Sequence, residues 1–181
     1  SARVALALST RLGTGGATFR HAGTGERESI SGFTGLFARG PLEELGGWDE
    51  EWVINQDAEL GARYVEAGHR IVVLPELAAQ YVPRNTLRAL ARQYALYGFY
   101  RVKTSLRHPW SMRRAHLLPP LVAATVAAAA LPGPQRRLAR AGVAGYAAAL
   151  GLTAAAAVRR AGIRDAAALP LVLATMHLAW G

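Results

Sequence analysis

Asp57 is the residue of this chain whose type and setting best suit acid–base chemistry. It follows a glycine-rich turn, 46–50, and Asn55 is placed to cap a helix that begins at Gln56. In the first turn of such a helix, the backbone N–H groups and the helix dipole stabilise an ionised carboxylate by about 0.3–1 kcal/mol. A carboxylate of this kind can accept the proton of a hydroxyl group as its oxygen attacks a carbon atom. A purely structural capping role for Asp57, beside Asn55, remains open.

The segments around Asp57 predict alternating strands and helices. Strands are expected at 3–8, 32–38 and 71–74, helices at 41–45, 56–67 and 86–106, and a glycine-rich loop at 13–16. Gly68 is placed to close the helix that contains Asp57, and Thr86 is placed to cap the long basic helix that follows. Leu60 and Tyr64 share one face of the first of these helices, which predicts that this face is buried.

Charge is divided unevenly along the 181 residues, which carry a formal net charge of +9. Every acidic residue except Asp165 lies at or before Glu76. The stretch that follows is basic, through Arg84, Arg88, Arg92, Arg101, Lys103, Arg107, Arg113 and Arg114. Nucleic acid and anionic lipid both attract such a stretch. Because long apolar segments come next, we favour anionic membrane lipids and expect no nucleic-acid partner.

Three apolar runs end the chain, at 117–131, 141–158 and 166–181. A helix needs about 20 apolar residues to cross a bilayer, so each run is short for a span. We interpret them as two complete transmembrane helices and a truncated third, with a buried amphipathic hairpin as the alternative. The chain begins without methionine and stops inside an apolar run, so we expect it to be part of a longer protein. Cysteine is absent, which excludes disulfides and thiolate metal sites, and the five histidines show no zinc-ligand spacing.

The order of short motifs along the chain is more specific than any one of them. They are Gly46-Gly47-Trp48-Asp49-Glu50, Asn55-Gln56-Asp57-Ala58-Glu59-Leu60, Arg63, Gly68-His69-Arg70-Ile71, Pro75, Tyr81-Val82-Pro83-Arg84 and Leu90-Ala91-Arg92-Gln93-Tyr94. This series closely resembles the C-terminal half of family 2 glycosyltransferases. Within them it is most similar to the bacterial succinoglycan-biosynthesis glucosyltransferases, which continue through a basic His-Pro segment, here His108-Pro109, into membrane helices.

The resemblance implies a fold and a set of site residues. The fold is α/β, the C-terminal part of a GT-A nucleotide-sugar transferase domain, followed by hydrophobic membrane helices. Asp57 takes the place of the catalytic base of an inverting sugar transfer. Substrate-binding positions are then expected at Gly47, Trp48, Asp49, Gln56, Arg92, Gln93 and Tyr94. For Asp49 a role in stabilising the turn stays open, as does simple solvation for the arginines. Glu59 is interpreted as a surface or structural residue, because it points away from Asp57 on a helix.

Two departures from the family pattern limit what the resemblance implies. The Asp-x-Asp motif, which holds Mg²⁺ or Mn²⁺ against the diphosphate, occurs nowhere in the chain. We therefore expect the metal ligands to lie outside this sequence, and this chain alone to be inactive. The second departure is the Gln-x-x-Arg-Trp motif of processive synthases: Gln93 is followed by Leu96 and Tyr97 at the Arg and Trp positions. Addition of single sugars is therefore favoured over polymer synthesis.

These inferences divide the chain into three parts: residues 1–83 as the C-terminal half of the catalytic domain, 84–116 as a basic interfacial helix and linker, and 117–181 as membrane helices. The function expected is sugar transfer from a nucleotide-sugar donor to a lipid-linked or glycan acceptor, in exopolysaccharide or cell-envelope synthesis. The expected location is the inner (plasma) membrane, with the catalytic part cytoplasmic. The alternative is a non-catalytic, membrane-anchored scaffold or partner-binding module derived from such a domain.

Overall fold

The chain folds into two compact units. The computed structural model describes residues 2–15, 26–29, 35–74 and 81–181. Unit 1 consists of Ser1–Ala17, Val82–Gly98 and Arg114–Gly181, and unit 2 of Thr18–Tyr81 and Phe99–Arg113. The long helix α5 (Leu87–Arg107) contributes its first part to unit 1 and its last part to unit 2. Over the described ranges the structure is mostly helical with a small sheet, the coarse form of the expected α/β fold.

Helix α4 (Gln56–Glu66) is the central element of unit 2. Its buried residues include Leu60 and Tyr64, which confirms the apolar face predicted from their spacing. The helix ends with Gly68 in the left-handed conformation, at a φ of 83°. The N–H of Gly68 bonds the carbonyl of Val65 and that of His69 bonds the carbonyl of Tyr64, which is the pattern of a Schellman cap. The predicted end of this helix is therefore confirmed.

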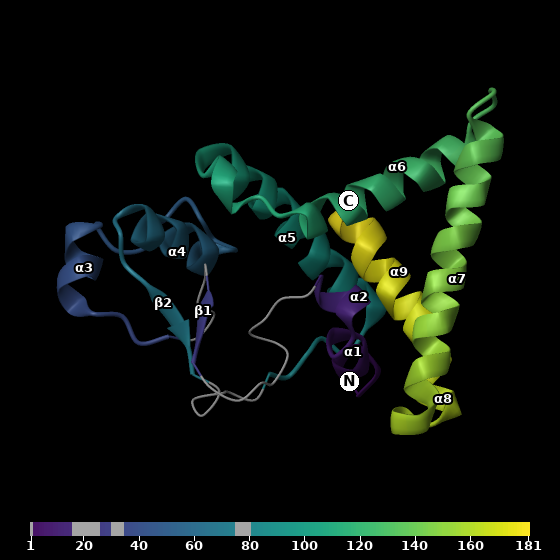
Figure 1. Cartoon of the computed structure of the whole chain (residues 1–181), viewed down its shortest axis with the longest axis horizontal. Coiled ribbons are helices and arrows are strands. Elements are labelled where there is room, and N and C mark those ends of the chain that lie inside the picture. Colours follow the sequence, from purple (N-terminus) through teal and green to yellow (C-terminus); the bar gives the residue numbers. More distant parts are fainter. Residues whose placement is uncertain (1, 16–25, 30–34, 75–80) are drawn as a thin grey trace. The chain divides into compact units, whose positions relative to one another are not determined.

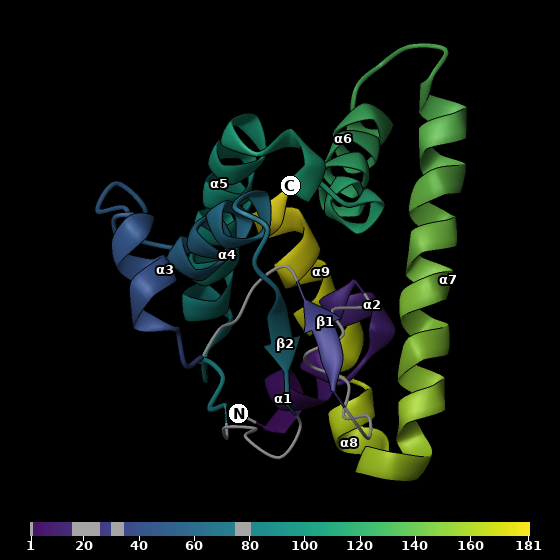
Figure 2. The same ribbon diagram turned by 60° about the vertical axis from the view of Figure 1, so that its left-hand side comes forward.

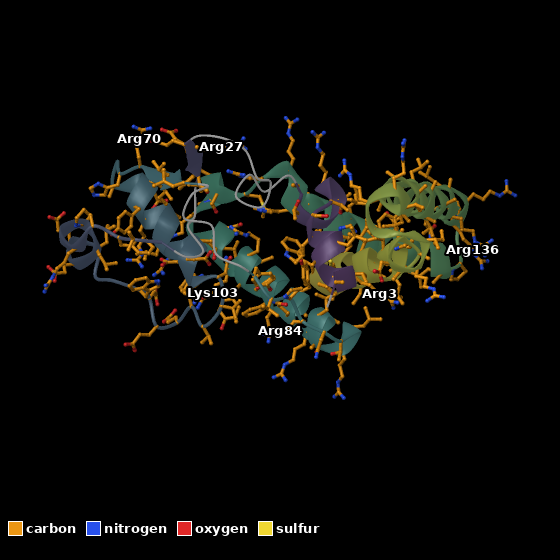
Figure 3. The ribbon with its side chains drawn as sticks, turned by 90° about the horizontal axis from the view of Figure 1, so that it is seen from below. Arg3, Arg27, Arg70, Arg84, Lys103 and Arg136 are labelled. Carbon is orange, nitrogen blue, oxygen red and sulfur yellow. The ribbon has the colours of Figure 1, made fainter. Side chains whose placement is uncertain are left out.

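The sheet of unit 2 has two antiparallel strands, β1 (Arg27–Ser29) and β2 (Ile71–Val73). Their register pairs Glu28 with Val72, and an exposed salt bridge joins Glu28 to Arg70 at the start of β2. Figure 3 labels Arg27, the first residue of β1, and Arg70, which directly precedes β2. The short helix α3 (Arg39–Glu44) precedes α4, close to the bounds predicted for it. The predicted strand at 71–74 is confirmed as β2, and its residues are half-buried.

Unit 1 is an assembly of helices. It contains α1 (Ala2–Leu8), α2 (Arg11–Thr14), the first part of α5, the 3-10 helix η4 (Arg114–Leu117), α6 (Leu118–Ala130), α7 (Arg136–Ala161), α8 (Ile163–Ala166) and α9 (Leu169–Trp180). Helix α9 packs against α6, α7 and α1, and its buried residues include Leu173 and Met176 (Figures 1 and 2). A second short 3-10 helix, η3 (Pro109–Ser111), follows α5 and belongs to unit 2.

Helix α7 is the one helix of the described ranges that is long and apolar enough to cross a membrane. Its 26 residues extend about 39 Å, more than the roughly 30 Å of a bilayer core. Helices α6 and α9 have 13 and 12 residues, too few to span by themselves. The apolar side chains of α7 are largely exposed, with Leu138 at 79% and Leu152 at 72%. Helix α7 is therefore not a buried core helix of unit 1.

Two predicted strands are not found where the structure is described. Residues 3–8, expected as a strand, lie in helix α1, because Val4, Ala7 and Leu8 have the helical i, i+3, i+4 spacing and are buried together. Of the strand expected at 32–38, residues 35–38 have no regular structure, and the remainder lies outside the described residues. Part of the expected loop at 13–16 is instead the end of α2, which closes at Gly15 in the left-handed conformation.

Gly98 provides a test of the packing in unit 1. A Cβ atom at this position would overlap the backbone carbonyl of Trp180, so we predict that Gly98→Ala destabilises the protein by about 1–3 kcal/mol. Gly145→Ala in α7 is the matched control, because a Cβ there meets nothing within 4 Å and Ala favours a helix. Thermal unfolding in detergent measures both variants. Equal melting temperatures would contradict the close approach of α5 and α9.

Candidate active site

Asp57 lies in the first turn of α4, where the sequence predicted it. Its side chain is partly buried, and this burial raises the pKa of the Asp57 carboxyl above its ordinary value. The backbone N–H groups of Ala58 and of Asp57 itself, and the charge of Arg101, act in the opposite direction. The helix-dipole effect expected from the sequence is therefore present but outweighed by desolvation. A carboxylate with a raised pKa is a stronger base for as long as it stays ionised.

Asn55 joins the start of α4 to the end of α5. Its backbone is left-handed, at a φ of 64°, and its side chain makes no capping hydrogen bond to α4. Instead the amide group donates to Thr104 Oγ1 at 3.0 Å and accepts from Arg101 Nη2 at 3.3 Å. Thr104 Oγ1 also accepts from the indole N–H of the buried Trp52 at 2.9 Å. These contacts bring Arg101 into electrostatic interaction with Asp57.

Glu59 is fully buried and forms the centre of an ion cluster in unit 2. Its carboxylate accepts hydrogen bonds from Arg63, at 2.8 Å from Nη2, and from Arg107 Nη1 at 3.2 Å. The buried ring of His108 lies beside it, with Nε2 3.6 Å from Glu59 Oε1, and bonds the carboxylate of Glu66 through Nδ1 at 2.7 Å. The structure thus confirms the structural role that the sequence analysis gave as one of two interpretations of Glu59. It is not a surface residue, because it is fully buried, and Arg63 and Arg107 compensate its charge inside the unit.

Arg63 links this cluster to the glycine turn. Its Nη1 donates to the carbonyl of Leu45 at 2.6 Å and its Nη2 to the carbonyl of Gly47 at 2.7 Å. Gly46 and Gly47 have left-handed φ angles of 75° and 71°, which other residue types adopt only with strain. The turn that the motif predicted is therefore fixed from inside the unit by a buried ion pair.

A cavity of about 250 Å³ lies at this turn. It is lined by Leu45, Gly46, Gly47, Asp49, Arg63 and Arg107. Asp49 bonds Arg107 Nη1 through one oxygen and the backbone N–H of Glu51 through the other. Arg107 holds the pKa of the Asp49 carboxyl below its ordinary value. The structure therefore shows the turn-stabilising role for Asp49 and also places this residue on a cavity wall, whereas Asp57 does not line that cavity.

The other site residues predicted in unit 2 are more exposed. Trp48 is 47% exposed and packs edge-on against Phe37, with ring centroids 5.3 Å apart. Its exposed part offers an apolar aromatic surface next to the glycine turn in the sequence. Gln56, at the start of α4, is exposed. Substrate contacts for both residues stay predictions.

Arg92, Gln93 and Tyr94 belong to unit 1, so they form a group separate from the residues above. Arg92 is exposed on α5. Gln93 donates to the hydroxyl of Tyr97 at 2.7 Å, and the rings of Tyr94 and Tyr97 lie 5.6 Å apart. Thr86 accepts a hydrogen bond from Ala89 at the start of this helix, which confirms the predicted cap. The binding roles of these three residues stay predictions.

Sequence reasoning missed the partners of the site that come from the end of α5 and from the residue that follows it. Thr104, Arg107 and His108 reach α4 and the glycine turn across more than 40 residues of sequence, and no local pattern marks them. The Glu59–Arg63 pair did carry a signal, since oppositely charged residues four apart on a helix attract each other. Across the described ranges, no three His, Asp or Glu side chains gather as metal ligands.

Comparison with known proteins adds one relative. The chain is similar to the Succinoglycan biosynthesis protein ExoA of Rhizobium meliloti. The two are 35% identical over 127 residues, which is 70% of this chain and 38% of that protein. The chain therefore spans well under half of the length of its relative. No protein-family model matches the chain, and no solved structure matches it significantly.

The ion cluster predicts that loss of the buried Glu59 carboxylate lowers the stability of the protein far more than loss of an exposed carboxylate. Glu59→Gln leaves Arg63 without its buried counter-charge, so we expect a loss of about 3–5 kcal/mol in the free energy of unfolding. Glu43→Gln is the control, because Glu43 pairs with Arg39 on the exposed surface, where such a pair contributes about 0–1 kcal/mol. Denaturant titration followed by tryptophan fluorescence measures both. A Glu59→Gln protein as stable as the control would show that the cluster is dispensable.

Proposed function

We propose that this chain is the C-terminal part of an inverting, membrane-bound glycosyltransferase of family 2, with a GT-A catalytic domain. Its donor is a nucleotide sugar and its acceptor a lipid-linked or glycan hydroxyl, in exopolysaccharide or cell-envelope synthesis. The observation that carries the proposal is a partly buried carboxylate, Asp57, at the first turn of α4 beside Arg101, in a chain similar to a succinoglycan biosynthesis protein. The three-part division at residues 83 and 116 belongs to the same proposal.

In this proposal Asp57 is the general base. The acceptor hydroxyl forms a bond from its oxygen to the anomeric carbon while its proton passes to the Asp57 carboxylate. The bond from that carbon to the nucleotide diphosphate breaks, and the diphosphate leaves with the bonding electrons. Attack opposite to the leaving group inverts the configuration at the carbon. Partial burial of Asp57 supports the role, because a desolvated carboxylate binds a proton more strongly than a solvated one.

The glycine turn is the proposed sugar-binding element. Gly47 and Asp49 line its cavity, and Trp48 presents an exposed ring beside it. Asp49 has hydrogen-bond acceptor capacity for sugar hydroxyl groups, and an aromatic ring suits the apolar face of a sugar. Gln56 is a further proposed substrate contact of unit 2. Arg92, Gln93 and Tyr94 are proposed as a separate group of substrate contacts in unit 1.

The divalent metal expected for this enzyme class does not fit the described residues of this chain. The sequence has no Asp-x-Asp, and in the described part of the chain no three His, Asp or Glu side chains lie close enough together to bind a metal ion. We propose that Mg²⁺ or Mn²⁺ is held by residues of the full-length protein outside this sequence. The chain's own residues bind the acceptor, orient it and remove its proton.

Helix α7 is proposed to anchor the protein in the inner membrane, with unit 2 on the cytoplasmic side. Its length and exposed apolar side chains support insertion into lipid. Arginines at both of its ends, Arg136 and Arg137 at one and Arg159 and Arg160 at the other, suit the two headgroup regions. Anionic lipids are the proposed partners of the basic residues of α5.

The proposed base is tested by Asp57→Asn in the full-length protein. The asparagine side chain does not accept the acceptor proton, so we expect the rate of transfer to fall by about 10²–10⁴-fold. The assay follows radiolabelled UDP-glucose, with UDP-galactose and GDP-mannose as alternative donors, into the lipid and glycan fractions of membranes. Membrane levels of the protein should stay unchanged.

Glu44→Gln is the matched control, because Glu44 is an exposed carboxylate of the same unit and lies outside the proposed site. Its transfer rate should equal that of the unchanged protein. Transfer by Asp57→Asn at the rate of the control would remove Asp57 as the base. Absence of transfer from all three donors by the unchanged full-length protein would favour the scaffold function instead.

The membrane position of α7 can be mapped with single cysteines, since this chain has none of its own. In a cysteine-free full-length background we expect Gly151→Cys, in the middle of α7, to resist a membrane-impermeant maleimide. Arg160→Cys, at the end of the helix, should react when the reagent reaches that side of the membrane. A Cβ at Gly151 meets nothing within 4 Å, so the variant fits sterically. Rapid labelling at Gly151→Cys in intact membranes would contradict a membrane span.

A further inference from the structure

Arg101 differs from the other cations at the end of α5. Lys103 and Arg107 each lie within salt-bridge distance of a carboxylate, Glu51 and Asp49 respectively. Arg101 donates instead to the neutral amide oxygen of Asn55, at 3.3 Å from Nη2. Its charge is therefore not cancelled by a hydrogen-bonded acid among the described residues.

The guanidinium of Arg101 is also partly removed from water. Its Nη1 is shielded from solvent and has no hydrogen-bond partner within the described part of the chain. Burial lowers the pKa of Arg101, and the negative charge of Asp57 opposes that shift, while the positive charge of Arg113 adds to it. A buried N–H without a partner destabilises the folded protein, so we look for a functional reason for it.

The role that we consider for Arg101 is an effect on the neighbouring acid, Asp57. Desolvation alone favours the protonated form of Asp57, which is too weak a base to take the proton of a hydroxyl group. Glu59, two positions further along α4, does not compete for Arg101, because its own carboxylate is bonded to Arg63 and Arg107. Arg101 is therefore the side chain whose positive charge acts on Asp57. Its hydrogen bond to Asn55 holds the guanidinium near the start of α4.

We infer that Arg101 is a positioning residue that keeps the Asp57 carboxylate ionised and ready to accept the proton of the acceptor hydroxyl. This inference rests on the proposed role of Asp57 as the base. Arg101 itself needs no contact with the substrate, because the field of its charge acts through a partly desolvated region. Loss of that charge makes Asp57 easier to protonate, and the rate then falls at a higher pH than in the unchanged protein.

The test is the pH profile of kcat/KM for transfer from radiolabelled UDP-glucose, or from whichever of the three donors is active, by the full-length protein. We expect Arg101→Gln, which retains a donor toward Asn55 but not the charge, to move the acid limb of the profile to higher pH. The rate above the limb should stay well above that of Asp57→Asn. Arg101→Lys keeps the charge and should leave the limb near its original position. Arg101→Met serves if the glutamine variant does not fold.

Lys103→Met is the matched control, since it removes one positive charge from the same end of α5 and Lys103 bonds Glu51 rather than Asp57. An acid limb that does not move in the neutral Arg101 variants, or that moves equally in Lys103→Met, would overturn the inference. If that happens while Asp57→Asn is inactive, the base assignment survives. An active Asp57→Asn protein would overturn the proposed function and this inference together.

Discussion

The buried carboxylate of Glu59 is the constraint on which the arrangement of unit 2 depends. An ionised acid without solvent is tolerated only when cations and hydrogen bonds compensate it, and here Arg63, Arg107 and His108 surround it. Each of these partners is committed to a second element as well. Arg63 holds the carbonyls of the glycine turn, Arg107 binds Asp49, and His108 binds Glu66 at the end of α4. Compensation of one charge thus sets the positions of a turn, a helix and the end of α5.

This arrangement gives two carboxylates on one short helix different surroundings. Asp57 and Glu59 are two positions apart on α4 and therefore face different surroundings. Glu59 is neutralised by direct ion pairs, whereas Asp57 has backbone N–H groups and the more distant charge of Arg101. The first acid is fixed and unavailable for chemistry. The second keeps free acceptor capacity, which is what proton transfer from a hydroxyl group requires.

Local sequence signals predicted the parts of the fold that local energetics determine. Gly68, Thr86 and the spacing of Leu60 and Tyr64 located the ends and the buried face of helices correctly, because caps and periodicity act within a few residues. The N-terminal segment 3–8 was mistaken for a strand, since a short apolar run fits both periods and its packing in unit 1 decides between them. The place of Asp57 was predicted, but not the sign of its net pKa shift, because burial depends on tertiary contacts. Asn55 was expected to cap α4 with its side chain, yet that side chain turns to α5, 46 and 49 residues away.

Position 55 must meet two requirements at once, and together they restrict which residue types can replace Asn55. A left-handed backbone is easiest for glycine and is tolerated by asparagine and aspartate, whereas branched residues are strained there. The hydrogen bonds to Thr104 and Arg101 need both a donor and an acceptor on a short side chain. Glycine satisfies the backbone but severs both contacts, and an ionised aspartate would neutralise Arg101 while giving up the donor to Thr104. Asparagine alone combines the backbone shape with a neutral, two-sided link, so variation here should be rarer than at the neighbouring exposed positions.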